Sequence, residues 1–163
     1  EVLIVVFIIG IGASLVMPRL LRRSPDKEWP GIHSALNNML YFARQEAITS
    51  QKVHRLVFDK RNRVATVEMD AGEKKPGERL YEPVHSHYFT SRYELPEGVS
   101  FVSLKMGKKD LFSEHKGMGW CYVVPHGLVQ DIVLTMDRVD MDKSSQQTFK
   151  VAPFLGTFEM EGD

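Results

Sequence analysis

The hydrophobic positions divide the chain into one long apolar run, one amphipathic stretch and a series of short alternating segments. Residues 2–17 form the apolar run, which follows Glu1 and contains no charged residue. The run is slightly shorter than the ~20 residues that span the hydrocarbon core of a bilayer. We expect residues 1–23 to form a membrane-inserted or bundle-packed helix that anchors the chain.

Two other interpretations of the apolar run fit it less well. A signal peptide has a basic region before its apolar stretch and a small-residue cleavage site after it, whereas this run starts at Glu1 and is followed by Pro18-Arg19. A buried core helix contributes roughly 10–14 apolar residues, and this run is longer and has no polar stripe. Because a carboxylate in apolar surroundings requires a positive partner or water, Glu1 favours an assembling helix.

A second helical segment is predicted after a break rich in proline. Residues 24–31 contain Pro25, Pro30 and Gly31, which we expect to kink or interrupt the helix. From residue 32 to residue 51 the apolar positions recur at steps of three and four, which is typical of an amphipathic helix packed on a sheet. The expected buried stripe consists of Ile32, Leu36, Met39, Leu40, Ala43 and Ala47. We assign residues 24–52 to this amphipathic second half of the helix.

Strand-like alternation begins at Val53 and continues to the end of the chain, so that residues 53–163 read as a β-rich domain. We expect roughly seven or eight short antiparallel strands there. Hairpins are predicted at residues 53–69 and 120–136, and further strands at residues 87–93, 99–106, 148–152 and 157–160. Surface loops are predicted at residues 71–83, 107–117 and 137–147. The predicted fold class is α+β, a long N-terminal helix packed on an antiparallel sheet or sandwich.

Composition narrows the class of protein. The 163 residues are 43% hydrophobic and 26% charged, which suits one globular domain beyond the anchor. The net charge is zero, which argues against a nucleic-acid binder, because such proteins neutralise phosphates with Lys and Arg. The single cysteine, Cys121, cannot form an internal disulfide, and its strand-like surroundings predict a buried structural thiol.

We predict no catalytic site, metal or cofactor. The sequence has neither a G-x-S-x-G nucleophile elbow nor a G-x-x-x-x-G-K-[ST] phosphate loop. His85 and His87 would share one face of a strand, but no acidic or sulfur ligand stands at a useful spacing from them. Asp137, Asp140 and Asp142 alternate as in a calcium loop, yet the glycine and the bidentate glutamate of such a loop are absent.

The opening of the chain resembles a known family. Glu1–Ile11 and the following Met17–Leu20 are similar to the mature N-terminus of type IV pilins and type II secretion pseudopilins. The resemblance implies that a leader and four residues, including an N-methylated phenylalanine, precede Glu1. It also implies that Glu1 meets the amino terminus of an adjacent subunit during assembly, and that Pro18 belongs to the family's helix. Gly10 and Gly12 lie in a small-residue patch that would let neighbouring helices approach closely.

Three further segments resemble the GspH/FimT branch, the minor pseudopilins and minor pilins. The helix segment around residues 40–48 is similar to the branch's A-R-x-E-A-I pattern, and the segments around residues 124–127 and 151–158 are similar to its P-x-G turn and its closing strand–turn–strand. The residues that carry these matches are Ala43, Arg44, Glu46, Ala47, Pro125, Gly127 and Gly156.

The resemblance implies a non-enzymatic minor pseudopilin of a type II secretion system, which joins a short periplasmic filament or its tip. Its partners would be other pseudopilins or pilins and the inner-membrane assembly platform. The chain would cross the bacterial inner membrane once and place its β-rich domain in the periplasm. The near alternative is a minor pilin that primes a type IV pilus. Some relatives of that kind bind DNA during uptake, but the acidic ending, Glu159–Asp163, argues against that here. A membrane-tethered ligand-binding domain is the more distant alternative.

Overall fold

The computed structural model describes residues 28–140 and 143–161. The predictions made for residues 1–23, including those for Glu1, Gly10, Gly12 and Pro18, fall outside these described residues. In the described part of the chain, no helix is both long and apolar enough to cross a membrane. The described residues from Gly31 onward cluster as one compact unit. Within this unit we call the β-rich part after residue 52 the head.

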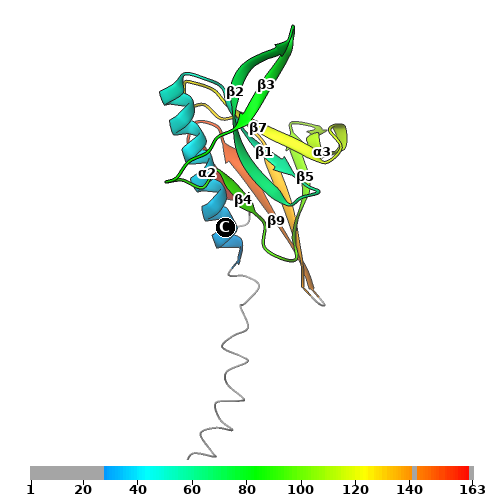
Figure 1. Ribbon diagram of the computed structural model, residues 1–163. Coiled ribbons are helices and arrows are strands. Elements are labelled where there is room, and N and C mark those ends of the chain that lie inside the picture. The colour runs from blue at the N-terminus through cyan, green and yellow to red at the C-terminus, as the bar shows by residue number, and fades with distance from the viewer. Residues whose placement is uncertain (1–27, 141–142, 162–163) are drawn as a thin grey trace, which may run out of the picture. The chain divides into compact units, whose positions relative to one another are not determined.

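The helix α2 spans Glu28–Ser50 and is drawn in blue and cyan in Figure 1. Every residue of the predicted stripe is at most 1% exposed: Ile32, Leu36, Met39, Leu40, Ala43 and Ala47. The break predicted at residues 24–31 is wrong for its last residues, because α2 already includes Pro30 and Gly31. Proline holds φ near the helical value, so helix can continue after it. The helix ends where Gln51 takes the left-handed conformation, with φ of 56°.

The described residues form ten strands in two sheets, and the strands pair antiparallel. The first sheet has the order β3 (Glu78–Pro83), β2 (Val64–Lys75), β1 (His54–Asp59) and β7 (Met118–Val123), with β4 (Arg92–Glu94) also paired to β2. The second has the order β10 (Thr157–Met160), β9 (Lys143–Ala152), β8 (Val133–Asp140), β5 (Val99–Met106) and β6 (Lys109–Asp110). A short helix, α3 (Leu111–Glu114), follows β6. The predicted α+β class is confirmed, with more strands than expected.

The two sheets meet in an aromatic core. Phe58 of β1 and Phe101 of β5 pack edge to face, with ring centroids 5.6 Å apart. Gly119 of β7 lies against the same core, where a Cβ atom would stand 2.5 Å from Leu104 Cδ2 and 3.2 Å from the Phe112 ring. A larger residue at this position would therefore displace the side chains of Leu104 and Phe112 in the close-packed core.

Cys121 of β7 is buried and free, so the prediction of a buried thiol is confirmed. Its Sγ lies 3.5 Å from the carbonyl oxygen of Gln130. Burial disfavours the thiolate and raises the pKa of Cys121 to about 12. The thiol therefore stays protonated at neutral pH and is a poor nucleophile.

The predicted hairpin at residues 53–69 is confirmed, because β1 and β2 pair from His54 opposite Met69 to Asp59 opposite Val64. The loop predicted at residues 71–83 is wrong. β2 continues to Lys75 and pairs with β3, and this hairpin extends away from the other strands (Figure 1). Most of its residues are exposed on both faces, so the sequence lacks the alternation that marks a half-buried strand.

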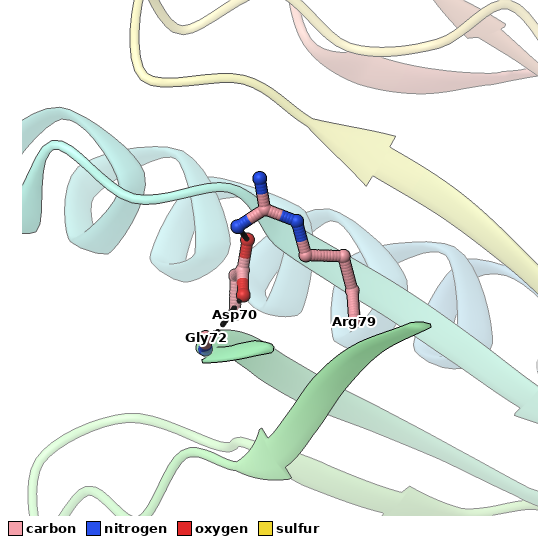
Figure 2. A network of polar contacts seen from close by, with 3 residues as sticks. All are labelled: Asp70, Gly72 and Arg79. Carbon is pink, nitrogen blue, oxygen red and sulfur yellow. Dashed lines mark hydrogen bonds and ion pairs between the residues drawn. The ribbon is translucent and has the colours of Figure 1, made fainter. Parts of the chain in front are cut away.

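We call residues 70–83 the arm. Its base is fixed by Asp70, which accepts a 2.8 Å hydrogen bond from the Gly72 amide and pairs with Arg79 at 3.2 Å (Figure 2). This network lies at a register shift between Asp70 and Gly72, where the ladder is interrupted. At the tip, Pro76 precedes Gly77, whose φ of 83° suits a type II turn.

The hairpin predicted at residues 120–136 is wrong, because β7 and β8 belong to different sheets. Only the isolated bridge between Val123 and Val129 pairs the two sides of the turn at residues 125–128. The loop predicted at residues 137–147 is also wrong, because β8 and β9 form a hairpin there. Burial alternates along β8 through Leu134, Met136 and Arg138, but at its end the buried position holds an arginine and the exposed position holds Val139. The polar and apolar residue types are therefore exchanged there.

The loop predicted at residues 107–117 contains β6 and α3, and Leu111 and Phe112 of α3 are buried. The strand predicted at residues 87–93 shrinks to β4, so His85 and His87 lie in irregular, exposed chain and share no strand face. The strands predicted at residues 99–106, 148–152 and 157–160 are confirmed as β5, the end of β9 and β10.

Candidate functional site

One face of α2 carries three polar side chains that bind backbone atoms of the C-terminal part of the head. His33, Asn37 and Arg44 follow one another at steps of four and seven residues, so they lie on one face of the helix. Their partners are the edge strand β10 and two turns, at residues 125–128 and 153–156. We call this set of contacts the seam.

Asn37 closes the open edge of the second sheet. Its Oδ1 accepts a 2.7 Å hydrogen bond from the Phe158 amide, and its Nδ2 donates to the Phe158 carbonyl at 3.2 Å. β10 is the terminal strand of its sheet in the described part of the chain, so no described strand pairs with these backbone groups on this side. The Asn37 amide takes the place of the missing peptide group, which protects an edge strand from pairing with another chain.

His33 adds a second contact to the same carbonyl. Its Nε2 lies 2.6 Å from the Phe158 oxygen and 2.9 Å from Asn37 Nδ2. A single ring nitrogen cannot donate to the carbonyl and accept from the amide in the same tautomer. The shorter distance to the carbonyl favours the tautomer with the proton on Nε2. In that tautomer Nε2 donates to Phe158, and Asn37 Nδ2 donates to Phe158 alone.

Arg44 holds both turns at once. Its Nε donates to the Gly127 carbonyl at 2.8 Å, and its Nη1 donates to the Leu155 carbonyl. The guanidinium carries its donors in a rigid fork, so both bonds fix the side chain in one orientation. The two turns also contact each other, because the Val129 amide donates to the Pro153 carbonyl at 3.2 Å.

Glycines make room for the Arg44 side chain. Gly127 and Gly156 have φ of 78° and 63°, in the left-handed region that favours glycine. A Cβ atom at Gly156 would overlap the Arg44 side chain, and one at Gly127 would lie 3.2 Å from Ile48 Cδ1. The structure thus brings together Arg44, Gly127 and Gly156, which the sequence analysis named from three separate segments. Their functional role stays a prediction.

The other motif residues lie outside the seam. Ala43 and Ala47 are fully buried on the core side of α2, where larger side chains would separate helix and sheets. The Glu46 carbonyl accepts a 2.6 Å hydrogen bond from the Ser50 hydroxyl near the end of the helix. Pro125 lines a shallow pocket with residues from the base of the arm.

Sequence reasoning missed His33 and Asn37. Both flank the predicted stripe, and a polar residue in that position usually faces solvent. Asn38, the next residue, is exposed, and nothing in the sequence distinguishes it from Asn37. The distinction depends on where β10 lies, more than a hundred residues later in the chain.

A buried histidine lies just after the helix. His54 at the start of β1 is fully buried, and its Nδ1 lies 3.1 Å from the Lys52 carbonyl. Its Nε2 has no hydrogen-bond partner within the described residues. Burial is the main cause that lowers the pKa of His54, because the charged ring would lose its hydration. The neutral ring is therefore the form that suits the folded head.

Large apolar side chains surround the seam on the surface. They are Tyr41 and Ile48 of α2, Leu128 of the first turn, and Phe154 and Leu155 of the second, each at least 43% exposed. We call these five residues the seam patch. Within residues 28–140 and 143–161, no three His, Cys, Asp or Glu side chains gather as metal ligands would. The arrangement is suited to holding protein segments together.

Comparison with known proteins identifies the fold. No family model matches the chain, and no curated protein sequence matches it. The structure of the minor pseudopilin EpsH from the type 2 secretion system of Vibrio cholerae matches with a TM-score of 0.56 and 16% identity, over 80% of this chain and 94% of that one. A crystal structure of the same Vibrio cholerae pseudopilin matches with a TM-score of 0.55 and 17% identity, over 78% and 89% of the two chains. The predicted pilin-like fold is confirmed, and it is pseudopilin-like.

Proposed function

We propose that this protein is a structural, non-enzymatic minor pseudopilin of a type II secretion system. The observation that carries the proposal is the pseudopilin-like fold of the described residues, matched over most of both chains. It is supported by the opening of the chain, where Glu1 heads an apolar run as in pilin-like subunits. The seam also supports the proposal, because it connects the head to α2 at several separate points.

In this proposal residues 1–23 pack among the helices of other pilin-like subunits. Glu1 pairs with a positive group of a neighbour, since an unpaired carboxylate in apolar surroundings is costly. Gly10 and Gly12 allow neighbouring helices to approach, and Pro18 belongs to the same helix. The chain is anchored in the bacterial inner membrane with its head in the periplasm, and it is delivered to the filament by the membrane assembly platform.

The seam gives the head a fixed position on α2. Three side chains of the helix bind the backbone of β10 and of both turns, so a movement of α2 has to carry these segments with it. A filament subunit needs this property, because its helix sets the position in the assembly while its head makes the surface contacts. We propose that Arg44, Gly127 and Gly156 serve this coupling.

The test replaces Glu1 in the full-length chain in its own bacterium. We expect Glu1→Ala to leave membrane insertion intact and to abolish co-isolation with the other pilin-like subunits, with loss of secretion. Glu97→Ala, at an exposed turn of the head, is the matched control and should change neither readout. Normal co-isolation and secretion of the Glu1→Ala variant would contradict the proposal and favour a plain membrane anchor. Loss of surface pili with normal secretion would assign the chain to a type IV pilus instead.

A further inference from the structure

The seam patch combines exposed apolar surface with a central cation. The exposed fractions are 54% for Tyr41, 43% for Ile48, 44% for Leu128, 82% for Phe154 and 65% for Leu155. Tyr41 and Ile48 lie three residues before and four residues after Arg44 on the helix, so they flank it on one face. Leu128 follows the Gly127 carbonyl that Arg44 binds, and Leu155 supplies the other carbonyl. Exposed apolar side chains gathered around one point in this way are typical of interaction sites.

Among the described residues, the cation in this patch has no acidic partner. The hydrogen bonds of the Arg44 guanidinium go to two carbonyl groups, which carry no net charge. None of the ion pairs between described residues includes Arg44. The guanidinium is half-buried among the apolar side chains, where its charge is screened less than at an open surface. A carboxylate brought to this position would therefore gain a charge-assisted contact.

We infer that the seam patch is the docking site for a neighbouring pilin-like subunit that presents a carboxylate flanked by large apolar side chains. The inference rests on the proposed function, from which it takes the class of partner. A symmetric contact with a second copy of this chain does not fit, because it would bring two Arg44 side chains together. Aromatic residues, leucines and an arginine around one point give the patch a composition common at the centres of protein interfaces.

The other flank of α2 provides an internal comparison. Tyr88 is 92% exposed, and its neighbour Phe89 stacks on Phe42 of the helix with ring centroids 5.4 Å apart. This loop also shows aromatic surface, but Arg92, the nearest cation in sequence, already pairs with Glu94 at 2.9 Å. The two flanks thus differ in free positive charge, which makes Tyr88 a matched control position.

The experiment introduces the photoreactive residue p-benzoylphenylalanine at position 154, or at position 88 as the control, in the full-length chain in its native membrane. After irradiation, mass spectrometry identifies the cross-linked peptide. We expect position 154 to give one discrete product with another pilin-like subunit, at a segment where Asp or Glu stands among large apolar residues. Position 88 should not give this product.

A second variant pair links the product to the patch. Leu128→Ser combined with Leu155→Ser should reduce the cross-link yield from position 154 several-fold, because both side chains are exposed and the Leu155 contact to Arg44 uses the backbone. Phe89→Ser is the control and should leave the yield unchanged. Equal thermal midpoints of the variants and the parent chain would show that the fold is intact.

The outcomes separate the two proposals. If the chain co-isolates with pilin-like subunits but position 154 gives no product, a product with lipid, or a product with a second copy, the docking inference is wrong and the proposed function stands. An unchanged yield in the double serine variant would also overturn the inference. If the chain does not co-isolate with pilin-like subunits at all, the proposed function fails and the docking inference fails with it.

Discussion

The seam and the arm are stabilised by different kinds of contact. In the seam, side chains of α2 bind backbone groups that follow more than eighty residues later in the chain. In the arm, β2 and β3 pair with each other, and the Asp70 carboxylate binds the nearby Gly72 and Arg79. The base of the arm contacts other strands through Tyr81, whose ring lies against Arg55 of β1 and Tyr122 of β7. Contacts between distant segments connect the parts of a fold, whereas contacts within one hairpin shape only that hairpin. A change in the seam should therefore affect the whole head, and a change in the Asp70 network of the arm should remain local.

Burial strengthens this difference. Phe158 is 1% exposed, so its backbone amide has no water to replace the Asn37 side chain. Arg79 of the arm is 59% exposed, and water replaces its ion pair at little cost. Removing one partner of a buried hydrogen bond costs the desolvation of the group left behind, which makes the seam the more sensitive region.

The largest effect of removing a side chain should come from Asn37→Ala. The variant leaves the Phe158 amide and part of its carbonyl without a partner in a buried position, and we expect the free energy of unfolding to fall by about 2 kcal/mol. Urea denaturation measures this change. Asn38→Ala, one residue along the helix and exposed, should stay within about 0.5 kcal/mol of the parent protein. Equal losses for the two variants would show that Asn37 has no special role.

The second effect concerns the fit between Arg44 and Gly156. Arg44→Ala should lower the free energy of unfolding by about 1.5 kcal/mol, since two hydrogen bonds to a charged donor are lost. Gly156→Ala should cost more than the roughly 1–2 kcal/mol of left-handed strain, because its methyl group displaces Arg44. In the Arg44→Ala background that additional cost should disappear, which a double-mutant cycle detects.

Gly77→Ala in the arm is the control for this cycle. Gly77 has a φ of 83° and open space where a Cβ would stand, so the substitution brings strain without a clash. Its cost should be the same with Arg44 or Ala at position 44. A coupling energy for Gly77 as large as that for Gly156 would mean that the seam and the arm are not independent.

A pH effect should follow from His54. Its pKa in the folded head is lowered from 6.5, mainly by burial, so the folded state binds its proton less readily than the unfolded chain. The contribution of His54 to stability is then fully present above pH 6.5 and is lost as the pH falls toward its lowered folded-state pKa. Urea denaturation between pH 8 and about pH 5 measures this slope.

Two histidine variants show whether the slope belongs to His54. His54→Phe removes the titrating group and should flatten the pH dependence in this window. His126→Gln, at an exposed turn position, should leave the dependence as it is in the parent protein. An unchanged slope in His54→Phe would mean that another group is responsible.

The smallest effect on global stability should come from Asp70→Ala in the arm. The lost pair with exposed Arg79 is worth about 0–1 kcal/mol, and the bond to the Gly72 amide is local. We expect the urea midpoint to change little, while limited proteolysis cuts the arm faster than in the parent protein. A global loss as large as that of Asn37→Ala would contradict the independence of the arm.

The stripe of α2 was predictable because its six residues repeat at helical spacing and are apolar, and all six are buried. The β1–β2 hairpin was predictable for the corresponding reason in a strand. The arm was not, because strands exposed on both faces show no alternation. The β8–β9 hairpin was not predictable either, because Arg138 is buried and Val139 is exposed, so the residue types at the end of β8 do not follow the strand pattern.

The seam was predictable only in part. The resemblance named Arg44, Gly127 and Gly156, but the sequence pattern could not show that they meet, because their contact depends on how two distant turns pack. Asn37 and His33 had no signal at all, since a polar residue beside a buried stripe usually faces water. The α+β layout follows from local periodicity, whereas the seam follows from tertiary packing.

The central claim is that Asn37 and Arg44 of α2 fix the C-terminal edge of the head, independently of the arm. Amide hydrogen exchange of Phe158, compared with the amides of β3, tests it most directly. We predict that the Phe158 amide exchanges only through global unfolding and that the β3 amides exchange much faster. In the Asn37→Ala variant, the Phe158 amide should exchange faster, and the increase should be larger than the loss of global stability explains. If Phe158 in the parent protein exchanges as fast as the β3 amides, the seam does not hold this edge and the account is wrong.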